Sequence, residues 1–165
     1  MRIVKKTLLS ILLCLGVMTG AVSAQGWTVT PGEGVGAVTV DSTLGSLEAI
    51  LKPTRKIGPE TKPAFVEFGK ALIIEFEANK VATISLHENS FATKNGNVSW
   101  VPYRGGAIGS AWNTVAGQIT SRKLSRKLPT AKGHPEEYYH AFPDIGLGFQ
   151  VKGGAISRVD IWRVR

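Results

Sequence analysis

Two histidines and two glutamates fall within seven residues near the end of the chain, in the segment His134-Pro135-Glu136-Glu137-Tyr138-Tyr139-His140. Imidazole and carboxylate groups are common ligands of divalent metals, so this segment is a candidate metal site. In an extended strand, alternation would place His134, Glu136 and His140 on one side. The same pattern is also typical of a solvated strand face. We therefore expect no metal and no other cofactor.

The patterns of known catalytic sites are incomplete. Ile108-Gly109-Ser110-Ala111-Trp112 lacks the first glycine of the G-x-S-x-G nucleophile elbow. The glycine-rich segments 32–36 and 105–109 have no following lysine, so they do not form a phosphate-binding loop. Cys14 is the only cysteine and lies in a segment that we expect to be removed, which excludes disulfides and thiolate sites in the mature chain. The sequence therefore favours a binding protein over an enzyme.

Large aromatic side chains are concentrated in the second half of the chain. Core packing alone does not require that asymmetry, and tyrosine and tryptophan are frequent anchors of protein interfaces. We therefore predict a partner-binding surface that includes Tyr103, Trp112, Tyr138 and Tyr139.

A basic stretch, Ser121–Leu128, repeats the tetrapeptide Ser-Arg-Lys-Leu. Cations are favoured at the C-terminal end of a helix by its dipole, so a stabilised helix end followed by a loop is one interpretation. The other is a rim that attracts an acidic protein or an anionic surface. On that second interpretation we add four residues to the predicted partner-binding site: Arg122, Lys123, Arg126 and Lys127.

The first 24 residues have the pattern of a cleavable signal peptide. A basic start is followed by the apolar run Thr7–Ala21 and by the small-x-small sequence Val22-Ser23-Ala24. The run is shorter than the ~20 apolar residues that span a bilayer. We therefore expect a periplasmic or secreted protein that begins near Gln25 and has no transmembrane segment.

Cleavage after residue 24 would leave 141 of the 165 residues. It would lower the formal net charge from +8 to +5, because the removed segment carries three cations and no acid. A moderately basic mature chain favours anionic neighbours. The excess of charge is far below that of a nucleic-acid-binding protein, and we expect no nucleic-acid partner.

An internal repeat is the strongest organising signal. Residues 72–86 match residues 147–161 at a constant offset of 75. Apolar residues coincide at Leu72/Leu147, Ile74/Phe149, Phe76/Val151, Val81/Ile156, Ile84/Val159 and Leu86/Ile161. Both segments alternate apolar and polar residues around a short turn. The pattern predicts two equivalent β-hairpins.

The repeat extends towards the N-terminal side of both hairpins. Trp27 opens the first copy and Trp100 the second, and in each copy a capping residue, Ser42 or Asn113, precedes a predicted short helix. Segments 52–63 and 126–135 are expected to be loops, each followed by a strand, at 64–68 and 138–142. We predict an α+β fold of two tandem repeats, 25–87 and 100–165, joined by a linker at 88–99. Each repeat would pack an antiparallel sheet against a short α-helix.

This arrangement resembles the tandem-repeat β-lactamase-inhibitor protein family and the related outer-membrane assembly lipoprotein fold. Val40-Asp41-Ser42-Thr43-Leu44 through Leu51-Lys52-Pro53 carries the resemblance, and Asn113-Thr114-Val115 is a weaker second match. The chain departs from the inhibitors in having no disulfide, and Cys14 lacks the setting of a lipidated cysteine.

The resemblance implies an exported inhibitor or immunity-type protein that acts on an enzyme. The alternative is an envelope-assembly or cell-wall accessory protein that uses its basic loop.

Overall fold

The computed structural model of this chain describes residues 26–121, 126–129 and 136–165. The predicted signal peptide, Arg122, Lys123 and His134 lie outside these residues. The fold is mixed α and β and is dominated by strands. Within the described residues, no helix is long and apolar enough to cross a bilayer.

The larger of the two sheets has eight antiparallel strands in the order β10-β11-β12-β13-β7-β6-β5-β4. Strands from the two predicted repeats therefore share one continuous sheet, in which β13 pairs with β7 at the centre. The strands are β4 (Arg55–Ile57), β5 (Phe65–Phe68), β6 (Leu72–Glu77), β7 (Lys80–Leu86), β10 (Arg126–Pro129), β11 (Glu137–Phe142), β12 (Leu147–Lys152) and β13 (Ala155–Trp162).

Both predicted hairpins are confirmed, as β6–β7 and β12–β13. Leu72 pairs with Leu86 in one, and Leu147 pairs with Ile161 in the other. Each has a single register shift, between Glu75 and Phe76 and between Gln150 and Val151, which are positions related by the offset of 75. The turn residues Ala78-Asn79 and Gly153-Gly154 all have positive φ, as the tight two-residue turns of hairpins require.

Two segments that we expected to be loops contain strands at the outer edges of this sheet. Segment 52–63 contains β4, and segment 126–135 contains β10, which places Arg126 and Lys127 on an edge strand. Neither segment shows the apolar alternation of a half-buried strand, because each forms a short edge that pairs on one side only.

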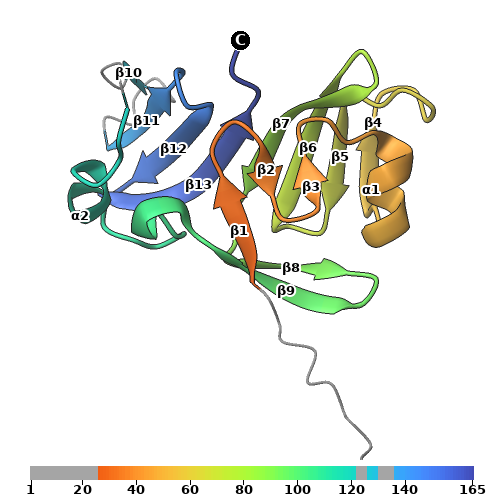
Figure 1. The fold of residues 1–165 in the computed structure, drawn as a ribbon, viewed down its shortest axis with the longest axis horizontal. Coiled ribbons are helices and arrows are strands. Elements are labelled where there is room, and N and C mark those ends of the chain that lie inside the picture. The colour runs from red at the N-terminus through yellow and green to blue at the C-terminus, as the bar shows by residue number, and fades with distance from the viewer. Residues whose placement is uncertain (1–25, 122–125, 130–135) are drawn as a thin grey trace, which may run out of the picture.

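A second sheet has the strand order β3-β2-β1-β9-β8 and lies in front of the larger one in Figure 1. Its strands are β1 (Trp27–Thr30), β2 (Gly34–Val35), β3 (Val38–Thr39), β8 (Ser90–Thr93) and β9 (Gly96–Val101). β1 and β9 run parallel, with Trp27 opposite Trp100. The segment 88–99, which we expected to be a linker, forms most of the β8–β9 hairpin.

Two short α-helices and one 3-10 turn complete the described elements: α1 (Leu44–Ile50), α2 (Trp112–Ala116) and η1 (Tyr103–Gly105). The predicted helix after residue 43 is confirmed as α1, but its N-cap is Thr43 and not Ser42, because the Thr43 hydroxyl accepts a hydrogen bond from the Ser46 amide. Asn113 lies inside α2, whose N-cap is Ala111.

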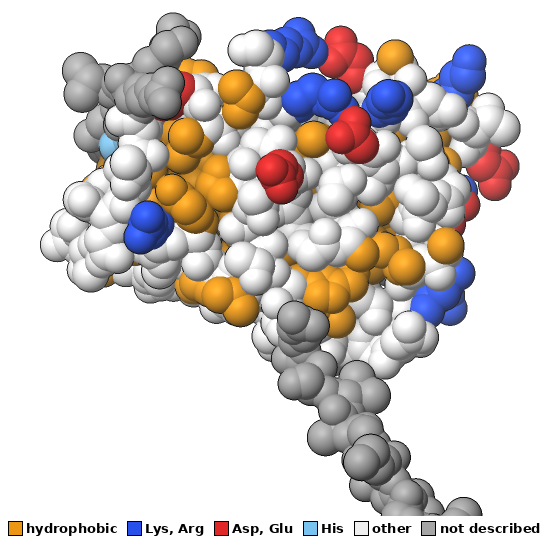
Figure 2. Space-filling model, in the orientation of Figure 1, with side chains coloured by type: hydrophobic (Ala, Val, Ile, Leu, Met, Phe, Trp, Pro, Cys, Tyr) orange, Lys and Arg blue, Asp and Glu red, His pale blue; other side chains and the backbone are white. Residues whose placement is uncertain are grey.

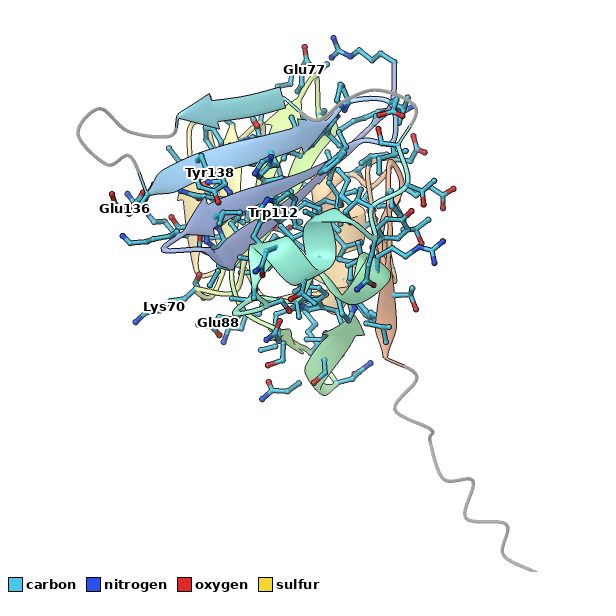
Figure 3. The ribbon with its side chains drawn as sticks, turned by 90° about the vertical axis from the view of Figure 1, so that its left-hand side faces the viewer. Lys70, Glu77, Glu88, Trp112, Glu136 and Tyr138 are labelled. Atoms are coloured by element: carbon cyan, nitrogen blue, oxygen red, sulfur yellow. The ribbon has the colours of Figure 1, made fainter. Side chains whose placement is uncertain are left out.

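Both helices and the five-stranded sheet lie on one side of the eight-stranded sheet, which we call the covered face (Figure 1). One buried apolar cluster joins them, with Leu47 from α1, Val115 from α2 and Trp100 from β9 packed with the sheet. We call the opposite side of the eight-stranded sheet the open face; it points to the left in Figure 3. Alternation along each strand decides which side chains reach it.

Candidate functional site on the open face

Strand alternation separates the predicted aromatic residues. Tyr138 and Tyr139 are neighbours on β11, so their side chains point to opposite faces of the sheet. Tyr138 shares the covered face with His140, whereas Tyr139 lies on the open face over β12. Tyr103, Trp112, Tyr138 and Tyr139 are all half-buried, and they do not form one continuous surface.

Trp112 and Tyr138 belong to an aromatic cluster between α2 and β11 (Figure 3). The Trp112 indole stacks on the His140 imidazole, with ring centroids 4.2 Å apart and planes inclined by 19°. Tyr138 meets the same imidazole edge-on at 5.0 Å. Trp112 also lies 5.4 Å from the Phe149 ring, a core residue. These contacts show that Trp112 holds α2 against the sheet.

The remaining predicted residues lie on other elements. Tyr103 is on η1 and packs against the buried core, with the Arg104 guanidinium 5.7 Å from its ring. Arg126 and Lys127 lie on the edge strand β10, which pairs with β11 so that Lys127 is opposite His140.

The candidate metal ligands are also dispersed. His140 is buried under Trp112, Glu136 is exposed in a turn, and His134 falls outside the described range. Within the described residues, no three His, Cys, Asp or Glu side chains are grouped closely enough to hold a metal ion.

A buried carboxylate, which our sequence reasoning missed, occupies the centre of the open face. Asp160 on β13 is only 4% exposed and accepts a hydrogen bond from Arg158 Nε at 3.0 Å. The Arg158 guanidinium also lies 5.7 Å from the Tyr139 ring. Burial, followed by the charge of Asp160, raises the pKa of the Tyr139 phenol far above its ordinary value. Tyr139 is therefore part of a packed polar cluster with Arg158 and Asp160.

Gly148 makes this packing possible. It is opposite Asp160 on the neighbouring strand, and the Tyr139 hydroxyl and the Trp162 indole both lie against its Cα. A β-carbon at position 148 would come within 1.9 Å of the Tyr139 oxygen. The missing side chain allows both rings to lie across β12.

The open face also brings together Ser85, His87 and Asp160, the residue types of a hydrolase triad. Ser85 is directly opposite Asp160. Burial and the charge of Arg158 lower the pKa of His87, and Asp160 partly opposes them. Nucleophilic catalysis requires the hydroxyl and the imidazole to be in hydrogen-bond reach. Among the hydrogen bonds of the described residues, none joins Ser85 to His87.

A row of five side chains crosses the first half of the open face. Consecutive members are paired across neighbouring strands, from β4 to β13, so all five point to the same side. In order, the row is Ile57, Phe65, Glu75, Thr83 and Trp162.

Two members of this row, Ile57 and Phe65, are exposed large hydrophobic residues, 39% and 38% exposed, and they are direct cross-strand neighbours. Their neighbour Glu75 is exposed as well. The other half of the sheet has Tyr139 at the position equivalent to Phe65, and Gly148 at the position equivalent to Ile73. Tyr139 can pack over Gly148 because glycine has no side chain, whereas Ile73 carries a side chain at that position on β6.

The row could have been anticipated from one short pattern. In Phe65-Val66-Glu67-Phe68, alternation buries Val66 and Phe68 on the covered face and therefore turns Phe65 to the open face.

Comparisons of this chain with protein-family models, with curated proteins and with solved structures find no match.

Proposed function

We propose that this chain is an exported, non-enzymatic binding protein of the inhibitor or immunity type, which binds an enzyme in the periplasm or outside the cell through its open face. The observation that carries this proposal is the exposed Ile57–Phe65 pair beside Glu75. Exposed apolar neighbours rimmed by charge are characteristic of binding surfaces. This location differs from the aromatic surface that we predicted on the second half.

The proposal includes a duplication of one structural unit. It is supported by the strand order of the eight-stranded sheet, in which β4 to β7 mirror β10 to β13 about the central pair. It is also supported by the pairing of β4 Arg55-Lys56-Ile57 and β10 Arg126-Lys127-Leu128 with their neighbours in matching registers. After duplication, replacement of Gly148 by Ile73, or the reverse, would have given the two halves different open faces.

The proposal predicts that one soluble enzyme is captured in a defined stoichiometry. Mature protein immobilised on a resin would be incubated with periplasmic extract of its native host, and bound proteins would be identified and quantified. We expect the double variant Ile57→Ala/Phe65→Ala to lose at least nine-tenths of the captured enzyme, because truncating a central anchor typically costs 2 kcal/mol or more in binding. Val101→Ala is the matched control, since Val101 is an exposed apolar residue on β9, in the other sheet.

Three outcomes would contradict the proposal. Equal capture by the double variant would move the site elsewhere. Equal loss in Val101→Ala would indicate nonspecific adhesion. Capture of anionic vesicles or an envelope complex, dependent on Arg126 and Lys127, would favour the envelope-assembly alternative. Amino-terminal sequencing of the native protein tests export separately, with Gln25 as the expected first residue.

A further inference from the structure

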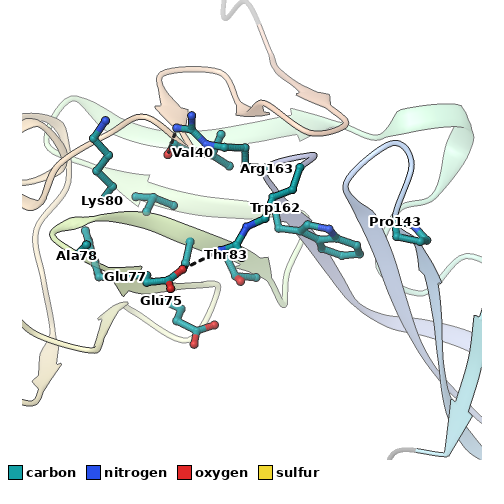
Figure 4. Close-up of a pocket in the computed structure, with 13 residues that line it drawn as sticks. Val40, Glu75, Glu77, Ala78, Lys80, Thr83, Pro143, Trp162 and Arg163 are labelled. Carbon is teal, nitrogen blue, oxygen red and sulfur yellow. Dashed lines mark hydrogen bonds and ion pairs between the residues drawn. The ribbon is translucent and has the colours of Figure 1, made fainter.

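A cleft opens at the end of the eight-stranded sheet where β7 and β13 separate. Their pairing stops at Thr83 and Trp162, and a cleft of about 1050 Å³ lies beyond these residues (Figure 4). Its lining starts at Glu75 on β6 and ends at Pro143, in the turn between β11 and β12. The exposed apolar pair on β4 and β5 does not line this cleft, so the cleft is a separate candidate site.

The two ends of the cleft differ in chemistry. The Trp162 indole points away from Glu75 and extends over β12, where it lies against Gly148. Because Pro143 lines the cleft as well, this end offers the carbon surfaces of two rings. The other end is polar, with the exposed Glu75 carboxylate directly opposite the half-buried Thr83. Neighbouring strands are about 4.8 Å apart, so the two ends, on β6 and over β12, are separated by roughly 14 Å.

Most of the charged groups in the lining are already paired. Arg163 donates a hydrogen bond to the Val40 carbonyl at 3.2 Å and forms an ion pair with Asp41, so it belongs to the wall. Arg165 pairs with Glu77 at 3.0 Å.

The charges that remain are balanced. Among the described residues of the lining, one carboxylate and one ammonium group have no ion pair, those of Glu75 and Lys80. Figure 2 shows the same mixture, with basic and acidic side chains interspersed along the top of the molecule. Such a lining has no net charge that would select a cation or an anion. It is nevertheless rich in groups that form hydrogen bonds.

A neutral ligand with several hydroxyl groups suits this lining. A carboxylate only accepts hydrogen bonds and an ammonium group only donates them, whereas a hydroxyl does both. Hydroxyls can therefore bind Glu75, Thr83 and Lys80 without leaving an unpaired charge on the ligand. Sugar rings also have C–H surfaces, which pack against apolar surfaces such as the rings of tryptophan and proline.

We infer that this cleft binds a neutral oligosaccharide. One sugar ring packs against Trp162 and Pro143, and hydroxyls of the following rings donate to the Glu75 carboxylate and accept from Lys80. The span of roughly 14 Å requires more than one ring. This ligand would be additional to the enzyme of the proposed function, and its binding does not depend on Ile57 or Phe65.

The test uses two neutral trisaccharides as probes, maltotriose and triacetylchitotriose. Each would be titrated into ¹⁵N-labelled mature protein, and the assigned indole N–H of Trp162 and the amide of Thr83 would be followed by NMR. Sorbitol is the matched control, because it is a neutral polyol without a sugar ring. We expect saturable shifts with at least one trisaccharide and none with sorbitol. Because the ligand is neutral, its affinity should be the same at about 0.05 M and about 0.5 M salt.

Two variants each remove one hydrogen-bonding group from the cleft. Thr83→Val keeps the shape of the side chain without its hydroxyl, and Glu75→Ala removes the carboxylate. Each should weaken trisaccharide binding by a factor of about two to ten, as expected for the loss of one hydrogen bond. Glu60→Ala is the control and should bind as the wild type does, because Glu60 is an exposed carboxylate between β4 and β5, outside the cleft. The melting temperature of each variant would be measured to exclude loss of folding.

The inference is overturned if neither trisaccharide shifts the two signals, if sorbitol shifts them equally, or if binding weakens steeply as salt is raised. It is also overturned if Glu75→Ala and Thr83→Val bind as tightly as Glu60→Ala. Enzyme capture without sugar binding would overturn only this inference, and sugar binding without enzyme capture would overturn only the proposed function.

Discussion

Ser85 and Asp160 are directly opposite each other at the centre of the eight-stranded sheet, and a pair of apolar residues flanks them on each side along the strands. Leu86 pairs with Val159 on one side, and Ile84 pairs with Ile161 on the other. Asp160 is a charged residue, yet it is buried at this centre. Burial of a charge is costly unless it is paired, so Arg158 should contribute to the stability of the fold.

Removing the cation that pairs with Asp160 should destabilise the protein. Arg158→Ala leaves a buried carboxylate without its partner, and we expect a loss of about 2–3 kcal/mol in the free energy of unfolding, measured by urea denaturation. The double variant Arg158→Ala/Asp160→Asn should recover part of this loss. Arg55→Ala is the control, because Arg55 and Glu67 form an exposed pair at 3.5 Å; it should change stability by less than about 0.5 kcal/mol. Equal effects of the two arginine variants would contradict this account.

A single methyl group at Gly148 should disturb the packed part of the open face. Gly148→Ala would push its β-carbon into the Tyr139 and Trp162 rings, and we expect a loss of about 1–3 kcal/mol, measured as a lower melting temperature. Gly117→Ala is the control, because Gly117 has a helical backbone and no atom near its missing side chain. It should be neutral or stabilising by up to about 1 kcal/mol. A tolerated Gly148→Ala would mean that the two rings are free to move.

Trp112 should contribute to stability and not to partner capture. Its indole packs between His140 and Phe149, so Trp112→Ala should cost about 3 kcal/mol of unfolding free energy. Asn113→Ala, at the next and exposed position of α2, should cost less than about 0.5 kcal/mol. If Trp112→Ala kept its melting temperature and lost the captured enzyme, the binding surface would be the one that we predicted on the second half.

The Tyr139 phenol should make stability fall in alkaline solution. Its pKa is raised in the folded state, whereas an unfolded tyrosine ionises near pH 10. Above pH 10 the unfolded chain therefore releases a proton that the folded chain retains, which favours unfolding by about 0.8 kcal/mol at pH 10.5. Melting temperatures at pH 8 and pH 10.5 would be compared for the wild type and Tyr139→Phe. The variant should lose less stability between the two values, and an identical loss would show that Tyr139 ionises freely.

The sequence alone determined the local elements. The alternation in Leu72–Leu86 and Leu147–Ile161 predicted both hairpins, because a period of two buries one face of a strand whatever lies beyond it. The apolar spacing of Leu44, Leu47 and Ile50 predicted α1 in the same way. The matching offset also predicted that the hairpins would share a register.

Only the tertiary structure decided how these elements meet. The antiparallel pairing of β7 with β13 and the parallel pairing of Trp27 with Trp100 join residues more than 70 positions apart, and no local pattern specifies such a partner. Alternation already required Tyr138 and Tyr139 to point in opposite directions. Which of them is covered depended on where α2 docks, since the helix buries one face of β11 and leaves the other to Arg158 and Asp160.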